Sequence, residues 1–166
     1  MMSTEPVADA TFVRKSVTVR VPVAHAFEVF TTRFDLWWPR SHHIGKAEME
    51  RAVLEGKEGG RWYERGVDGA ECDWGRVLEW DPPKRVVLSW HIMVTWGYDP
   101  DPAHASRVEV TFHEEGPGVT RVELVHSHLD RHGADWQKMR ASIAGDGGWS
   151  GLLSGFAAKA AETLRG

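Results

Sequence analysis

Two histidines near the end of a strand-like run have the type and spacing to do chemistry. His126 and His128 would point to the same face of a strand, because side chains alternate along it. Neutral imidazoles in that arrangement can bind a metal ion, but a site needs a third ligand. No other residue has a spacing that supplies one, including His42-His43, His91, Glu64 and Glu123. We therefore predict no metal site, and we expect His126 either to orient the polar end of a ligand or to be a structural histidine.

A nucleophile for covalent catalysis is not evident in the sequence. Cys72 has no basic partner nearby in the chain, and a lone thiol in a strand is usually inert. Ser154 is not the central residue of a Gly-x-Ser-x-Gly elbow. Gly59-Gly60 leads into a strand rather than a helix, so it is not a phosphate loop, and we predict no cofactor. Enzymes that only orient a reactive substrate leave no such signature, so a cyclase, hydrolase or isomerase stays open as an alternative.

Aromatic side chains are the unusual feature of the composition, with nine tryptophans against two tyrosines. Apolar and aromatic walls with a few polar groups are typical of small-molecule pockets. The same indoles could also fill the space as a packed core. The predicted ligand-binding residues are Trp37, Trp38, Trp62, Trp74, Trp90, Phe112, His126, Trp149, Leu153 and Phe156.

Most of the chain reads as strands that would form the wall behind these residues. Residues 12–21 alternate with Val13, Val17, Val19 and Val21 on one face, which predicts a half-buried strand. Six further runs follow, separated by glycine- and proline-rich turns without intervening helices, so we predict an antiparallel meander. The runs are roughly 46–54, 60–65, 72–80, 85–95, 107–114 and 119–128.

Helical patterns flank this meander on both sides. Val23, Ala26, Phe27 and Phe30 repeat at helical spacing after Pro22. Residues 133–143 predict a further helix, and a last, longer helix starts near Trp149 and carries an apolar stripe to Leu164. Gly151 and Gly155 lie within that helix, which leaves open a close approach of another segment, a flexible helix, or a helix–helix contact in a homodimer. Residues 96–105 and 130–147 are candidate lids.

Charge and length limit the other classes of function. The 166 residues carry a net charge of −4 with both signs interspersed, so we expect no nucleic-acid partner. No apolar run approaches the roughly 20 residues of a membrane span, and the first residues do not resemble a secretory signal. One cysteine excludes an internal disulfide. We expect a cytoplasmic protein with one domain, residues 12–164, after a flexible N-terminal segment, residues 1–11.

Motifs in this order resemble those of a known superfamily. The chain is similar to the SRPBCC superfamily, which includes lipid-transfer and birch-pollen-allergen-like proteins, and within it to the branch named after the heat-shock ATPase activator co-chaperones. The resemblance spans roughly residues 12–164. It rests on Val21-Pro22-Val23 with Ala26-Phe27, Trp37-Trp38-Pro39, Gly59-Gly60-Arg61-Trp62, Trp74-Gly75-Arg76-Val77, Asp81-Pro82-Pro83-Lys84-Arg85 with Leu88-Ser89-Trp90, Arg131-His132-Gly133, and Gly147-Gly148-Trp149 with Leu152-Leu153.

The resemblance implies an α+β helix-grip fold, in which a curved antiparallel sheet of about seven strands wraps around a long C-terminal helix. It also implies a cavity between sheet and helix. Our first hypothesis is therefore the binding of an apolar or aromatic small molecule there. The alternatives are a protein-interaction module, as the co-chaperone name implies, and an enzyme that uses the same cavity.

Overall fold

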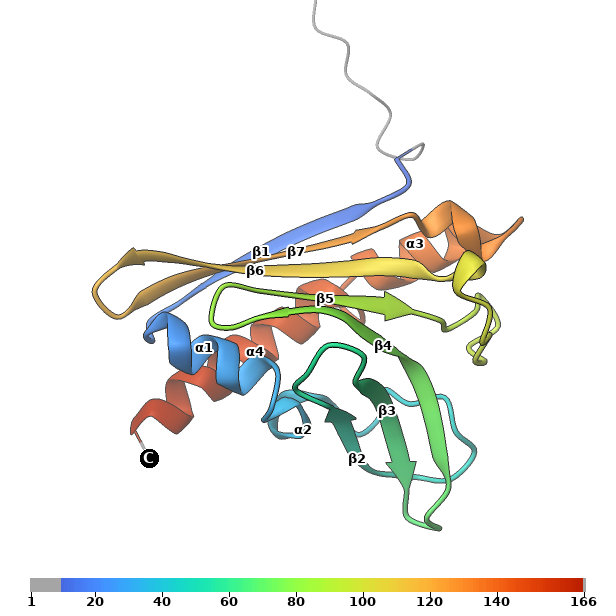
Figure 1. The fold of residues 1–166 in the computed structure, drawn as a ribbon, viewed down its shortest axis with the longest axis horizontal. Helices are drawn as coiled ribbons and strands as arrows, with labels where there is room; N and C mark the ends of the chain where they lie inside the picture. Colours follow the sequence, from blue (N-terminus) through green and yellow to red (C-terminus); the bar gives the residue numbers. More distant parts are fainter. Residues whose placement is uncertain (1–9, 166) are drawn as a thin grey trace, which may run out of the picture.

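The fold is one curved sheet with helices on one side, as Figure 1 shows for the computed structural model of the chain. The structure describes residues 10–165. Seven antiparallel strands pair in the order β1-β7-β6-β5-β4-β3-β2. Their bounds are β1 (Val13–Val19), β2 (Met49–Leu54), β3 (Arg61–Gly66), β4 (Glu71–Asp81), β5 (Arg85–Trp90), β6 (Ser106–Gly116) and β7 (Val119–Ser127).

Four α-helices connect and cover the strands. They are α1 (Val23–Phe30), α2 (Phe34–Trp37), α3 (Trp136–Ala144) and α4 (Trp149–Arg165), with short 3-10 helices η2 (Pro102–His104) and η3 (Leu129–His132). In Figure 1, α4 runs beneath the sheet, and α1 and α2 lie at one end of it. The predicted helix-grip fold is confirmed. Within the described residues, no helix is long and apolar enough to span a bilayer.

Register shifts bend the part of the sheet that holds the tryptophans. The pairing slips between Trp62 and Tyr63 on β3 and between Val77 and Glu79 on β4. Such bulges increase local bend and twist. Gly75 lies between them, and a Cβ there would stand 1.7 Å from the carbonyl oxygen of Ser89. Only glycine allows β4 to approach β5 this closely.

Aromatic side chains fill the middle of the space between α4 and the sheet. Phe156 of α4 contacts Phe30 and Trp37 with ring centroids 5.2 and 5.6 Å apart. Phe112 of β6 packs edge-on against Phe27 at 5.1 Å. The centre of the helix-grip is therefore packed core, and open space has to lie nearer to one end.

Three predictions about local structure need correction. The strand predicted at 85–95 ends at Trp90, because a tight turn follows in which Met93 donates its amide to the Gly97 carbonyl. The helix predicted at 133–143 begins only at Trp136, since Gly133 adopts a positive φ of 96°. His128 does not share a face with His126: β7 ends at Ser127, and His128 is exposed with a left-handed φ of 60°.

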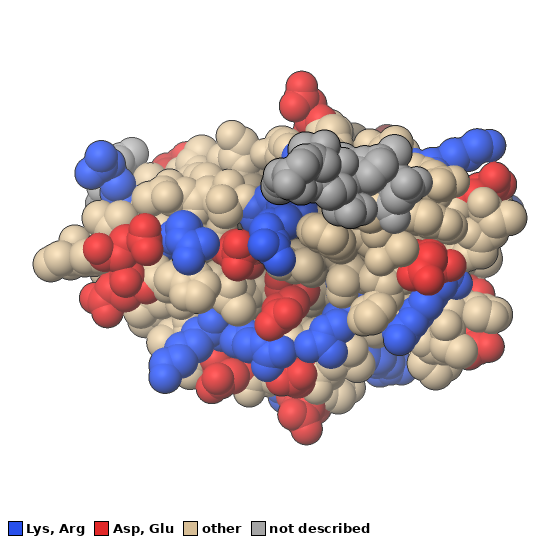
Figure 2. All heavy atoms as spheres, turned by 90° about the horizontal axis from the view of Figure 1, so that it is seen from above, with Lys and Arg blue, Asp and Glu red and all other residues tan. Residues whose placement is uncertain are grey.

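The outer surface carries charges of both signs. Arg85 pairs with Glu109 at 2.7 Å across β5 and β6, and Arg121 lies 3.9 Å from Glu123 on β7. On the face drawn in Figure 2, basic and acidic side chains are interspersed. That face therefore presents no basic patch of the kind that binds nucleic acid. Of the predicted N-terminal segment, residues 1–11, the first nine residues lie outside the part of the chain that the structure describes.

Candidate functional site

A cavity of about 380 Å³ lies at the N-terminal end of α4, and we call it the tryptophan pocket. Its walls come from the loop before β2, from β4 and β5, from the turn after β5, and from the end of α3, the α3–α4 connection and the start of α4. The lining residues are Trp38, Ser41, His42, His43, Ile44, Trp74, Trp90, Ile92, Trp96, Ser142, Ile143, Gly147, Gly148, Trp149 and Leu152. The exposed ones, Ser41, Trp96, Ser142 and Gly147, mark its mouth.

The floor of the tryptophan pocket is made of packed indoles. Trp38 lies 5.3 Å from Trp74 and 6.1 Å from Trp149, measured between ring centroids. Trp90 approaches Trp149 at 6.0 Å in an edge-on arrangement. Four of the ten predicted ligand-binding residues, these four tryptophans, therefore line one cavity.

The other six predicted residues lie in the core around the pocket. Trp62 packs behind Trp74 and Trp90 at 5.6 and 5.7 Å. On α4, Leu152 lines the pocket while its neighbour Leu153 is buried elsewhere in the core. All six are buried and absent from the lining, namely Trp37, Trp62, Phe112, His126, Leu153 and Phe156.

His126 lies directly behind the pocket wall, at the centre of a chain of hydrogen bonds. The Trp149 Nε1–H donates to His126 Nδ1 at 3.1 Å. An indole nitrogen can only donate, so Nδ1 carries no proton and His126 Nε2–H donates to Ser106 Oγ at 2.7 Å. Ser106 Oγ also lies within hydrogen-bond distance of His132 Nε2, at 2.7 Å. Because its Nδ1 carries no proton, His126 is neutral, and its hydrogen bond fixes the orientation of Trp149.

Burial explains why these histidines stay neutral. Loss of solvation lowers the pKa of His126 well below its usual value, and positive charge on His132 would lower it further. Burial also lowers the pKa of His132. Since both ring nitrogens of His126 are already hydrogen-bonded, the structure gives this residue a supporting position behind the wall.

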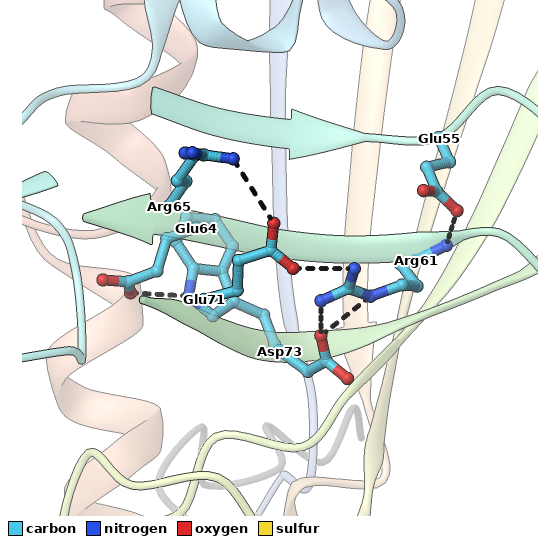
Figure 3. Close-up of polar contacts among 7 residues, drawn as sticks. Glu55, Arg61, Glu64, Arg65, Glu71 and Asp73 are labelled. Carbon is cyan, nitrogen blue, oxygen red and sulfur yellow. Dashed lines mark hydrogen bonds and ion pairs between the residues drawn. The ribbon is translucent and has the colours of Figure 1, made fainter. Parts of the chain in front are cut away.

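Glu64 of β3 is a buried carboxylate that holds one side of the mouth. Its side chain accepts hydrogen bonds from the backbone amides of Ile44 and Gly45 at 2.6 and 3.0 Å and from Trp74 Nε1 at 2.9 Å. In Figure 3 its carboxylate lies beside an indole nitrogen, while the ion pairs of Arg61 gather to one side. A Cβ on Gly45 would stand 2.9 Å from Glu64 Oε2, so glycine permits this contact.

Two histidines on the loop before β2, His42 and His43, line the pocket and differ in which ring nitrogens are hydrogen-bonded. His42 Nε2–H donates to the Gly147 carbonyl at 2.8 Å and so connects the two sides of the mouth. His43 Nδ1–H donates to the Gly45 carbonyl at 2.9 Å and lies 3.8 Å from Glu64 Oε2. Among the described residues, His43 Nε2 has no hydrogen-bond partner, and the His43 side chain lines the pocket.

Two buried indole nitrogens also lack a partner within residues 10–165. They are Nε1 of Trp62, in the core, and Nε1 of Trp90, whose side chain lines the pocket. Trp90 is only 5% exposed. A buried donor without an acceptor costs about 1–3 kcal/mol, so the Trp90 Nε1–H would be stabilised by any acceptor that comes within hydrogen-bond distance of it.

Sequence reasoning found part of the mouth: Trp96, Ser142 and Gly147 lie within residues 96–105 and 130–147, the segments predicted as candidate lids. It did not assign His42, His43 and Ile44 to the pocket, because they lie in a loop, where hydrophobic periodicity gives no signal. The sequence gives His42 and His43 no role beyond that of possible metal ligands. No group of three or more His, Cys, Asp or Glu side chains with metal-binding geometry occurs among the described residues. Burial raises the pKa of the Cys72 thiol, with the charge of Glu64 acting in the same direction, so the thiolate form is disfavoured.

The curved sheet around the long helix α4 places this protein in the class of helix-grip α+β proteins, with an indole-walled pocket at the end of that helix. The chain belongs to the family described as Activator of Hsp90 ATPase homolog 1-like protein, whose model matches residues 20–160. This confirms the predicted branch of the SRPBCC superfamily. A comparison with curated proteins found no match.

Solved structures support the assignment over nearly the whole chain. The anthrahydroquino-gamma-pyrone synthase Txn09, complexed with SUM, is 44% identical and has a TM-score of 0.64, with 90% of this chain and 97% of that chain covered. CalC from Micromonospora echinospora, a self-sacrificing resistance protein, is 33% identical with a TM-score of 0.68 and coverage of 94% and 97%. Protein NE0264 from Nitrosomonas europaea, 13% identical with a TM-score of 0.66 and coverage of 93% and 96%, shares the fold.

Proposed function

We propose that the tryptophan pocket binds a planar, polycyclic aromatic molecule that carries a carbonyl oxygen. The observation that carries this proposal is the buried Trp90 Nε1–H, which lacks a partner among the described residues at the wall of an indole-lined cavity. A carbonyl oxygen of the ligand would accept this hydrogen bond. The aromatic rings of the ligand would pack against Trp38, Trp74 and Trp149.

Size and chemistry of the pocket agree with such a ligand. Its volume of about 380 Å³ falls within the roughly 300–1,000 Å³ of small-molecule sites. Most buried lining residues are aromatic or aliphatic, which favours burial of an apolar ring system. The name of Txn09 describes a synthase of anthrahydroquino-pyrones, which are planar polycyclic aromatics, and its 44% identity supports a related ligand here.

The proposal can be tested by titrating the protein with 1,8-dihydroxyanthraquinone while recording tryptophan fluorescence. We expect saturable quenching at one ligand per chain. Trp90→Phe keeps an aromatic ring but removes the N–H, and we expect affinity to fall about five- to tenfold, the value of one hydrogen bond. Trp62→Phe is the matched control, because its Nε1 is equally buried and unpartnered but lies outside the pocket lining. Equal affinities of both variants would contradict the role of Trp90.

A second candidate function is catalysis of ring closure on such a ligand, and His43 favours it. Its Nδ1–H is held by the Gly45 carbonyl, which leaves Nε2 able to take a proton from a ligand hydroxyl. The hydroxyl oxygen would add to the far carbon of a carbon–carbon double bond conjugated to a carbonyl of the same molecule, and the π electrons of that double bond would move toward the carbonyl oxygen as an enolate. Trp90 Nε1–H would stabilise the carbonyl oxygen that gains charge. Return of the proton to the adjacent carbon completes an isomerisation without a co-reactant.

One variant, His43→Gln, distinguishes a role of His43 in catalysis from a role in ligand binding. With an anthrahydroquinone that carries a conjugated ketone side chain next to a ring hydroxyl, His43→Gln should lose turnover at least about a hundredfold while its ligand affinity changes little. His113→Gln, an exposed histidine on β6, should leave both unchanged. Full turnover by His43→Gln would remove His43 from the reaction. For a protein-interaction module, no specific observation among residues 10–165 gives support, and we do not propose it.

A further inference from the structure

Trp96 differs from the other four tryptophans of the pocket. Trp38, Trp74, Trp90 and Trp149 are buried, whereas the Trp96 side chain is 46% exposed at the mouth. Its φ of 66° lies in the left-handed region, where a bulky residue is rare. A large aromatic residue thus stands at the edge of the cavity in a backbone conformation that favours glycine or asparagine.

The turn around Trp96 is closed by hydrogen bonds of its backbone. Trp96 donates its amide to the Met93 carbonyl at 2.8 Å, and Met93 donates to the Gly97 carbonyl at 2.7 Å. Ile92 and Tyr98 form an isolated antiparallel bridge at the base of the turn. These contacts hold the backbone of the turn that carries the Trp96 side chain at the mouth.

We infer that Trp96 covers the ligand at the mouth of the tryptophan pocket and selects planar aromatic molecules over aliphatic ones of similar size. This inference rests on the proposed function. The exposed indole would bury its remaining apolar surface only when a flat ring lies against it, and stacked aromatic pairs gain more than area burial alone. Trp96 is therefore a specificity-determining residue whose contribution appears only in the complex. Trp90, which also lines the pocket, carries the unpartnered Nε1–H to which the proposed function assigns the polar contact.

Three variants at this position separate aromatic stacking from bulk and from backbone strain. Trp96→Phe keeps a ring, Trp96→Leu keeps apolar bulk at the same strained φ, and Trp96→Gly relieves the strain. The probes are 1,8-dihydroxyanthraquinone and dodecanoate, measured by isothermal titration. We expect Trp96→Phe to bind the anthraquinone within about twofold of the unsubstituted protein, and Trp96→Leu and Trp96→Gly to lose about tenfold. Dodecanoate affinity should change by less than about threefold in all three.

The outcomes distinguish this inference from the proposed function. If the unsubstituted protein binds no anthraquinone, the proposed function fails and the role of Trp96 fails with it. If it binds, and Trp96→Leu or Trp96→Gly binds equally well, only the inference about Trp96 is overturned. Thermal unfolding serves as the folding control. Trp96→Gly should unfold at the same or a higher temperature, because glycine adopts a positive φ without strain. A folded Trp96→Gly with weakened anthraquinone binding supports the inference.

Discussion

Trp149 and His126 are joined by a hydrogen bond of 3.1 Å that connects the wall of the tryptophan pocket to the buried centre of the sheet. Trp149 is the first residue of α4, and His126 lies on β7. The same bond fixes the tautomer of His126 and thereby the direction of its hydrogen bond to Ser106, which also hydrogen-bonds to His132. The orientation of one pocket wall thus depends on residues that do not line the pocket.

Breaking this bond from one side should destabilise the fold. His126→Leu leaves the Trp149 indole and the Ser106 hydroxyl without this partner in the interior, which we expect to cost about 2–4 kcal/mol of unfolding free energy. In the double variant His126→Leu with Trp149→Phe, the indole donor is gone as well. Urea denaturation of all four proteins should give a coupling of about 1 kcal/mol or more. Strictly additive losses would contradict a direct interaction.

Acid should weaken the fold through the two neutral histidines. Burial lowers the pKa of His126 and of His132 below the value of about 6.5 that histidine has in an unfolded chain. Below that pH the unfolded state therefore binds more protons than the folded state. The stability is complete above about pH 6.5 and falls as the pH drops from there toward the folded-state pKa values.

The slope of the unfolding free energy against pH shows whether His126 contributes to the acid sensitivity. Each such histidine contributes a slope of up to about 1.4 kcal/mol per pH unit. The pKa of the exposed His104 is raised by its hydrogen bond to Asp99, which acts in the opposite direction. We expect His126→Gln to reduce the slope of unfolding free energy between about pH 6.5 and pH 5 by about one proton. An unchanged slope would show that His126 is not a source of the acid sensitivity.

Glu64 should contribute far more to the free energy of unfolding than the neighbouring carboxylate Glu71. Glu64→Gln replaces one acceptor oxygen by an NH₂ group that faces amide donors, so we expect the free energy of unfolding to fall by about 2 kcal/mol or more. The amides of Ile44 and Gly45 should then exchange hydrogen faster. Glu71→Gln is the matched control, since Glu71 is partly exposed and pairs with Arg61 at 3.0 Å. It should cost less than about 1 kcal/mol. Equal losses would contradict the anchoring role of Glu64.

The two glycines of α4 should respond in opposite directions to the same substitution. A Cβ on Gly151 would stand 2.0 Å from the carbonyl oxygen of Asp146, whereas a Cβ on Gly155 would meet nothing within 4 Å. Gly151→Ala should therefore destabilise the fold by about 1–3 kcal/mol, and Gly155→Ala should stabilise it by about 0.5–1 kcal/mol. Guanidinium denaturation distinguishes them. A stable Gly151→Ala would mean that the α3–α4 connection can move away.

Hydrophobic patterning was sufficient to predict the sheet and the long helix. Val108, Val110 and Phe112 alternate along β6 and are all buried, and the stripe on α4 buries Leu152, Leu153, Phe156 and Ala160. These patterns reflect local geometry, which the sequence carries directly. Of the three interpretations of Gly151, the structure supports the close approach, because the Asp146 carbonyl packs against it.

The pocket could be predicted only in part, because its mouth depends on contacts between distant residues. Trp37 and Trp38 are adjacent, yet only Trp38 lines the cavity, and no period in the sequence separates them. The loop that carries His43 is placed by Glu64, about 20 residues further along the chain. Likewise, Trp96 is exposed in a turn where its backbone has a positive φ, a conformation that propensity assigns to glycine.

The central claim, that an aromatic ligand hydrogen-bonds to Trp90 in the pocket, is tested most directly by the indole N–H resonances of the nine tryptophans. Trp90 and Trp62 are assigned by Phe substitution, and 1,8-dihydroxyanthraquinone is added to ¹⁵N-labelled protein. We expect the Trp90 Nε1–H to move downfield more than any other indole proton, while that of Trp62 moves little. A titration that leaves the chemical shift of the Trp90 Nε1–H unchanged, or that shifts only the resonances of indoles outside the tryptophan pocket, would contradict the account.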